Sequence, residues 1–324
     1  MTLVIDLSAL LLGFFFLARG SGWLVAGASE IAGHLGVRPL VLGLTVVAWG
    51  TSLPEVLVSG LAAVEGQAGI ALGNVLGSNA ANIGLVLGAC SLILPGVLHK
   101  RLDSRESLWL LAALGLFWWC AKDGGFSRVD GAFLLSALLI YNLQLFWEAR
   151  EAALGTKAQE PRRDTWLQRH PKYAVAIGGI TLALAAQAVM VGAVGLAQRA
   201  GLSDLVIGLT VVAIGTSLPE LAAGLSAALR GHGELLIGNV VGSNVFNVLG
   251  VIGIVALIHP LGGAADPKTE AMIEISLGQD LPVVLAFSLA AIFLPLLAPG
   301  RGGRAKGAVL LGGWLTYTLS LVCG

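Results

Sequence analysis

The chain contains one stretch twice, as LVLGLTVVAWGTSLPE at Leu40–Glu55 and as LVIGLTVVAIGTSLPE at Leu205–Glu220. The register continues without a gap into GNVLGSNAANIGLVLG at 73–88 and GNVVGSNVFNVLGVIG at 238–253. Across about 50 aligned positions roughly half are identical, which chance does not give even in an apolar sequence. The chain is therefore a duplicated unit.

The composition places this duplicated unit in a membrane. Apolar residues make up 56% of the 324 positions and charged residues only 12%, a balance that soluble domains do not keep. A spanning helix needs roughly 20 mostly apolar residues, and the apolar runs leave little chain between them. We expect an all-α membrane protein with about ten spans, at residues 3–31, 40–64, 69–95, 107–121, 129–148, 173–198, 205–229, 234–258, 279–297 and 307–323.

The charged residues predict how these spans are oriented. The longest polar stretch, Arg150–Lys172, is basic, and basic loops face the cytoplasm. Placing it inside puts most other Lys and Arg side chains inside and both termini outside. We expect a first repeat at residues 1–150, a basic cytoplasmic loop at 151–172 and a second repeat at 173–324, in a multi-pass protein of the plasma (inner) membrane. The zero formal net charge gives no sign of a nucleic-acid partner.

The parity of the spans shows how the two copies are related. Glu55 falls in the second predicted span and Glu220 in the seventh, so the second copy crosses the bilayer in the opposite sense. The prediction is two inverted five-helix repeats. Inverted repeats are typical of secondary transporters, whose substrate site lies near the bilayer midplane between the copies.

Two glutamates, Glu55 and Glu220, lie in the middle of predicted spans. An ionised carboxylate at that depth costs several kcal/mol unless it has a partner, and no Lys or Arg is near either residue in the sequence. A single glutamate of this kind can be protonated and hydrogen-bonded across the bundle. For a pair in symmetric motifs, a bound cation or proton is the more natural counter-charge.

Each glutamate follows a proline, Pro54 or Pro219, which cannot donate a backbone hydrogen bond and presses on the carbonyl four residues back. Freed carbonyls at membrane depth are tolerated where they line a cavity or meet other partners. A simple proline kink is the bland alternative, but it would not need polar neighbours. Here the neighbouring turns carry further oxygens in both copies: Thr51 and Ser52, with Thr216 and Ser217.

A polar stripe follows in each copy. Its residues recur every four positions and so share one helix face: Asn74, Ser78 and Asn82, with Asn239, Ser243 and Asn247. Amides and hydroxyls in lipid also serve as contacts between helices, but a whole stripe beside a carboxylate favours a cavity lining. Asn79 and Asn244 lie off the stripe, and we expect them to make hydrogen bonds between helices.

These ligands are hard oxygens without sulfur or imidazole, which suits Ca²⁺ or Na⁺ rather than zinc or copper. Two carboxylates neutralise one Ca²⁺ or two Na⁺. A site of this kind can hold either load but not both together, which is the physical basis of exchange.

The paired GTSLPE and GNVxGSN segments resemble the two alpha repeats of the calcium/cation antiporter superfamily, in its prokaryotic sodium/calcium exchanger branch. The resemblance implies a ten-helix fold with four central ion sites, occupied alternately by several Na⁺ or one Ca²⁺, and access that changes as the first and sixth helices slide over the rest. It implies a ligand set of Ala48 and Ala213 (carbonyls), Thr51, Ser52, Glu55, Ser78, Asn82, Thr216, Ser217, Glu220, Ser243 and Asn247.

One departure concerns Asn247, where some members of the superfamily carry an aspartate. An amide leaves two formal charges in the site, which puts a potassium-dependent mode and the number of Na⁺ ions in question. The proton-coupled members use a differently spelled motif, but coupling to H⁺ stays open.

The function predicted from these features is an antiporter that exchanges Na⁺ for Ca²⁺. A cation channel could use the same oxygens, but channels tend to gather their filters from several subunits. An intramembrane enzyme is disfavoured, because the chain has no HExxH, Ser/Lys dyad or nucleotide motif. We expect no enzyme activity and no cofactor: Ca²⁺ and Na⁺ bind as substrates, the bilayer is the surrounding partner, and one chain suffices for transport whatever the oligomeric state.

Overall fold

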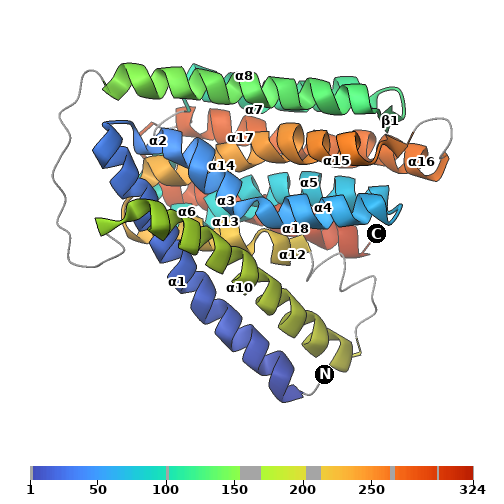
Figure 1. Cartoon of the computed structure of the whole chain (residues 1–324), viewed down its shortest axis with the longest axis horizontal. Coiled ribbons are helices and arrows are strands. Elements are labelled where there is room, and N and C mark those ends of the chain that lie inside the picture. Colours follow the sequence, from blue (N-terminus) through green and yellow to red (C-terminus); the bar gives the residue numbers. More distant parts are fainter. Residues whose placement is uncertain are drawn as a thin grey trace.

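The computed structural model describes residues 3–99, 102–153, 169–201, 213–262, 267–297 and 299–323 (Figure 1). In these parts the chain is almost entirely helical, and its helices form ten consecutive segments. The segments of the first half are α1 (Leu3–Leu35), the run α2 (Pro39–Leu42), η1 (Gly43–Val47), α3 (Ala48–Thr51) and α4 (Leu53–Val64), the run α5 (Ala68–Ala81), η2 (Asn82–Leu87) and α6 (Gly88–Ile93), then α7 (Ser104–Ala121) and α8 (Arg128–Ala153). A short 3₁₀ turn, η3 (Pro95–His99), follows α6.

The second half repeats this order. Its segments are α10 (Pro171–Arg199), the pair α12 (Ala213–Thr216) and α13 (Leu218–Leu229), the run α14 (Gly233–Phe246), η5 (Asn247–Val251) and α15 (Ile252–Ile258), the run α16 (Pro267–Ile275), η6 (Ser276–Asp280), α17 (Leu281–Phe293) and η7 (Leu294–Leu296), and α18 (Gly303–Cys323). The elements η1, η2, η5 and η6 are π-helical turns within longer helices.

The lengths of the helices agree with a membrane protein. Within the described residues, six helices are long and apolar enough to cross a bilayer alone, and the pair Pro39–Thr51 and Leu53–Val64 makes a seventh despite a 45° bend. The remaining segments are α7, α13 and α18. The predicted seventh span falls partly outside the described residues, because 202–212 are not among them.

Two details differ from the sequence prediction. The ninth segment begins at Pro267 rather than near residue 279. In its early turns Glu270 and Glu274 are exposed, while Ile273 is buried. In addition, two short strands, β1 (Gly125–Phe126) and β2 (Leu261–Gly262), pair antiparallel, a small detail in a fold that is all-α as predicted.

The second half runs opposite to the first. In Figure 1, α2 to α4 and α14 to α15 run from left to right, whereas α12 to α13 and α5 to α6 run from right to left. Helices α1 and α10 pack along each other and also point in opposite directions. Each described segment of the second half therefore runs opposite to its counterpart in the first, as the parity of the spans predicts.

Contacts between loops identify the two ends of the bundle. At one end, Arg38 pairs with Asp103 (3.1 Å) and Glu234 (3.8 Å), and Arg105 pairs with Glu148 (2.6 Å). At the other end, pairing of β1 with β2 joins the α7–α8 loop to the α15–α16 loop. The loops around Arg38 and Arg105, which the charge pattern places on one side, thus lie at one end of the molecule.

The α1–α10 pair is held by backbone contact and by one ion pair. A Cβ atom at Gly178 would lie 2.6 Å from the backbone nitrogen of Leu24, and one at Gly20 would lie 3.0 Å from the Gly178 carbonyl oxygen. Near the end of α10, Arg199 Nε donates to Asp6 Oδ2 at 2.7 Å, and the Asp6 side chain is fully buried. Small residues therefore let these two long helices approach closely.

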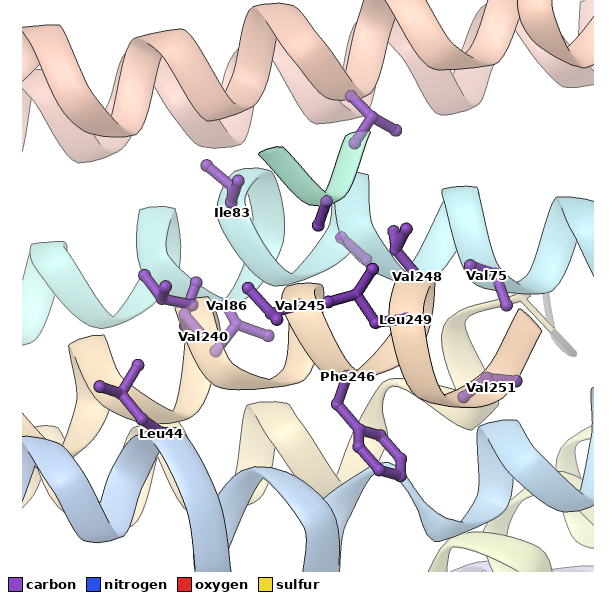
Figure 2. Close-up of a cluster of buried hydrophobic side chains, with 14 of the residues drawn as sticks. Leu44, Val75, Ile83, Val86, Val240, Val245, Phe246, Val248, Leu249 and Val251 are labelled. Carbon is purple, nitrogen blue, oxygen red and sulfur yellow. The ribbon is translucent and has the colours of Figure 1, made fainter. Parts of the chain in front are cut away.

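The other helices pack around the two helices of each half that carry the GTSLPE and GNVxGSN motifs. Figure 2 shows Leu44, Val75, Val86, Val245 and Leu249 from both halves packed in one buried cluster. A Cβ atom at Gly238 would lie 2.9 Å from the Cα atom of Gly43, so the backbones of α14 and η1 touch. This packing fixes the polar faces of the motif helices against each other at the centre of the fold.

Candidate ion-binding site

The helix that carries Glu55 is interrupted at Ser52. Ser52 has φ −87° and ψ 9°, and Ser217 has nearly the same values, φ −85° and ψ 4°. Pro54 and Pro219 follow in the first turn of the next helix, where a missing N–H costs little. The equal geometry in the two halves places each glutamate in the first turn of a new helix, where the dipole favours a negative charge.

Both carboxylates are fully buried, and each accepts one hydrogen bond through Oε1. Ser78 Oγ donates to Glu55 at 3.3 Å, and Ser52 Oγ donates to Glu220 at 3.0 Å. The Oε2 atoms of both glutamates have no partner among the described residues. Since Ser52 lies in the first half and Glu220 in the second, the second contact joins the two repeats.

Thr51 lies beside these serines and also faces the other half. Its Oγ1 atom is 3.3 Å from Asn239 Oδ1, 3.5 Å from Ser243 Oγ and 3.3 Å from the carbonyl oxygen of Ala48. The Ala48 carbonyl also accepts the backbone N–H of Ser52 at 3.0 Å. In this conformation its oxygen is therefore used within its own helix.

The equivalent positions of the second half are also buried. Thr216 and Ser217 are almost fully buried, and Ser217 Oγ has no partner among the described residues. Ala213 begins α12, directly after the residues that are not described. The predicted hydroxyl and carboxylate groups of both halves are therefore buried inside the fold.

Asn74 departs from the predicted cavity lining. Its Nδ2 atom donates to Ser59 Oγ at 2.9 Å and lies 3.4 Å from the Glu55 carbonyl oxygen, so it ties α5 to α4. The reason is Ser59, which has a glycine, Gly224, as its counterpart in the second half. The motif comparison gave no signal for Ser59 because it lies outside the GTSLPE segment.

Four asparagines join the two polar stripes at the centre. Asn79 and Asn244 each donate through Nδ2 to the backbone carbonyl of the other at 3.2 Å. Asn82 Nδ2 donates to Asn244 Oδ1 at 3.0 Å, and Asn247 Nδ2 donates to Asn79 Oδ1 at 3.1 Å. The predicted hydrogen bonds of Asn79 and Asn244 between helices are thus present.

The buried polar atoms left without a partner in the described residues are mostly acceptors. Around the centre they are Glu55 Oε2, Glu220 Oε2, Asn82 Oδ1 and Asn247 Oδ1, together with the Ser217 hydroxyl and one donor, Asn239 Nδ2. Buried oxygens are normally paired. A cation that prefers oxygen ligands is a group that could satisfy the unpaired oxygens among these atoms. Among the described residues, no three His, Cys, Asp or Glu side chains are grouped so that they could hold a metal ion.

A cavity of about 750 Å³ lies between the α1–α10 pair, α4 and the start of α5, and none of the predicted ligands lines it. Its lining is mainly apolar and includes Val58 and Met190, with Asp6, Glu65 and Arg199 as its charged residues. Val58 is about one helical turn beyond Glu55. The sequence contained no signal for this cavity, because it forms between helices that are distant in the chain.

The fold and the central oxygens define a polytopic membrane protein with a buried cluster of polar oxygens where its two oppositely running halves meet. The chain belongs to the sodium/calcium exchanger protein family, which matches residues 6–147 and 171–322.

Relatives match along nearly the whole length. A putative antiporter, CaxA, of Alkalimonas amylolytica is 36% identical over 95% of both chains. The sodium/calcium exchanger MaX1 of Methanosarcina acetivorans is 32% identical over 98% of this chain and 99% of its own. Among solved structures, the sodium-calcium exchanger NCX_Mj superposes with a TM-score of 0.76 at 33% identity, covering 98% of this chain and 99% of that one. The chain is therefore a transporter of the cation antiporter class.

Proposed function

We propose that the protein exchanges Na⁺ for Ca²⁺ by alternating access, with both loads bound between Glu55 and Glu220. The observation that carries the proposal is the set of buried, unpartnered oxygens, two of them from carboxylates, where the inverted halves meet. One Ca²⁺ or two Na⁺ neutralises the two carboxylates, so the loads compete for one site. The names of the relatives support the same pair of ions.

The remaining ligands of the proposed site are the groups that share this centre. They are Thr51, Ser52, Ser78 and Asn82 from the first half, Thr216, Ser217, Ser243 and Asn247 from the second, and the carbonyls of Ala48 and Ala213. The Ala48 carbonyl accepts two internal hydrogen bonds here, so it binds an ion only after the Thr51 hydroxyl turns away. The inverted repeats correspond to residues 1–150 and 173–324, joined by the basic segment 151–172.

The proposed orientation in the inner membrane puts both termini outside. It follows from the basic residues of the loops at the Arg38 end, which is the cytoplasmic end under the positive-inside rule. The cavity beside α4 then opens toward the extracytoplasmic side, because it is lined by Asp6 and Arg199 at the opposite end.

The test is uptake of radioactive Ca²⁺ by vesicles that contain the purified protein. Vesicles loaded with Na⁺ and diluted into Na⁺-free buffer should take up Ca²⁺, and vesicles loaded with K⁺ should not. An outward H⁺ gradient in the absence of Na⁺ tests the alternative coupling. Uptake driven by H⁺ alone would replace Na⁺ as the coupling ion, and downhill Ca²⁺ flux independent of any counter-ion would indicate a channel instead.

A further inference from the structure

The four central asparagines hold each other in one orientation. Their contacts form two equivalent halves: Asn79 with Asn247, and Asn244 with Asn82. All four residues are buried, with at most 1% of their surface exposed. In this conformation their hydrogen bonds to one another decide which end of each amide faces which neighbour.

The orientation follows from two backbone carbonyls. The carbonyl oxygens of Asn79 and Asn244 can only accept, so the groups 3.2 Å from them must be the Nδ2 ends of Asn244 and Asn79. The Oδ1 ends of these two amides then point the other way. They face Asn82 and Asn247, which must approach them with Nδ2.

The consequence concerns the ligands. Because Asn82 and Asn247 use Nδ2 in this network, their Oδ1 atoms are the ends left over, buried and without a partner in the described chain. The two ends of an amide have almost the same size, so packing alone does not choose between them. A cation is attracted by the oxygen and repelled by the NH₂ group.

We propose that Asn79 and Asn244 are positioning residues, which do not touch the ion but turn Asn82 and Asn247 so that oxygen faces the transported cation. The inference rests on the proposed ion site. Each positioning residue acts on a ligand in the other repeat: Asn79 of the first half orients Asn247 of the second, and Asn244 of the second half orients Asn82 of the first. Each repeat thereby determines which end of an amide in the other repeat faces the ion.

The same geometry predicts how position 247 tolerates a charge. An ionised aspartate has no donor, so in Asn247→Asp an ionised carboxylate oxygen takes the place of Nδ2, 3.1 Å from the Asn79 oxygen. Two acceptors then face each other. An acid at 247 is therefore unfavourable while Asn79 is present, and it becomes acceptable when the residue at 79 no longer presents an oxygen.

A double-mutant cycle tests this coupling. The variants are Asn79→Leu, Asn247→Asp and both together, compared with the unchanged full chain in detergent. The first measurement is the rise in Tm on titration with CaCl₂, which reports binding without transport. The second is the KM and maximal rate of Na⁺-dependent Ca²⁺ uptake. If leucine prevents folding, Asn79→Ala removes the same groups without adding bulk.

With Asn247 present, Asn79→Leu should weaken apparent Ca²⁺ affinity roughly tenfold, the scale of one hydrogen bond to a ligand. The change should appear in KM more than in the maximal rate. In the Asn247→Asp background, Asn79→Leu should cost nothing or improve affinity, since a carboxylate presents oxygen in either orientation. The matched control is Asn79→Leu with Asn82→Asp, which should be additive because Asn79 does not orient Asn82.

A purely structural role for Asn79 predicts a different result. Loss of a contact between helices would lower Ca²⁺ affinity by the same factor whether residue 247 is asparagine or aspartate. Equal losses with and without Asn247→Asp would overturn the proposal, and so would unchanged Ca²⁺ affinity in Asn79→Leu. If the unchanged protein shows no stabilisation by either Ca²⁺ or Na⁺, the ion site itself is wrong. That outcome is visible before any variant is compared.

Discussion

Replacement of Glu220 by glutamine tests the charge of the site with almost no change in shape. The Ser52 hydroxyl donates to Oε1 at 3.0 Å, and a glutamine oxygen can keep this hydrogen bond. The amide NH₂ group then takes the position of Oε2, the atom without a partner among the described residues. The substitution therefore removes one negative charge and directs two donors toward the proposed ion.

The expected loss is large even under conservative assumptions. Two unit charges 4 Å apart interact by about 4 kcal/mol at an effective dielectric constant near 20, so Ca²⁺ and one carboxylate interact by about 8 kcal/mol. Changes in solvation and the remaining amide oxygen offset part of this energy. If only one third is lost, about 2.7 kcal/mol, Ca²⁺ affinity falls about 100-fold.

The fold should survive, because a neutral amide is cheaper to bury than an ionised carboxylate. The assay is thermal unfolding of the purified protein with and without CaCl₂, together with Ca²⁺ uptake into Na⁺-loaded vesicles. We expect an unchanged or higher Tm without Ca²⁺, no rise in Tm with Ca²⁺, and no exchange. Glu55→Gln should behave in the same way, since Ser78 keeps its contact with Oε1.

The matched control is Glu274→Gln, an exposed glutamate on α16, which should retain normal uptake. Ca²⁺ affinity within about threefold of the unchanged protein in either Glu55→Gln or Glu220→Gln, at normal expression, would refute the reasoning from paired carboxylates, since threefold is less than 1 kcal/mol.

The other predictions concern voltage, topology and packing. With only two carboxylates in the site, more than two bound Na⁺ carry net positive charge. Ca²⁺ uptake driven by Na⁺ exit should therefore accelerate when a valinomycin-imposed K⁺ potential makes the vesicle interior positive, and slow when it is negative, at about 2.3 kcal/mol per charge per 100 mV. In a chain without native cysteines, Lys157→Cys and Lys268→Cys should react with an impermeant thiol reagent from opposite sides. Gly238→Ala should destabilise the protein by about 2 kcal/mol, because its Cβ would meet backbone of η1, whereas Gly60→Ala, with open space around it, should not.

Each of these predictions has a clear contrary outcome. A rate of Ca²⁺ uptake that does not change with membrane potential would indicate exchange of two Na⁺ or two H⁺ per Ca²⁺. That result would not contradict the site formed by the two glutamates. Labelling of both cysteines from one side would contradict the number of spans between them. Equal Tm values for the two alanine variants would mean that α14 and η1 can separate at no cost.

Much of the architecture follows from the sequence alone. Long apolar runs need helices in lipid because every backbone group must find its partner within the segment. The internal repeat and the odd offset between Glu55 and Glu220 require two halves that run in opposite directions. The burial of these glutamates in mid-span also follows from local sequence, and so does the helix break next to each proline.

Only the tertiary structure shows where the two repeats, which are equivalent in sequence, differ in their hydrogen bonds. Ser78 bonds the glutamate of its own half, whereas Ser52 bonds the glutamate of the other half, a choice that depends on how closely the helices pack. Ser59 draws Asn74 out of the cavity lining. Repeat motifs cannot show such differences, because they record what the halves share, while hydrogen bonds between side chains depend on positions in space. The orientation of the four central amides is of the same kind, since it is imposed by backbone carbonyls of the opposite half that only the folded chain brings within 3.2 Å.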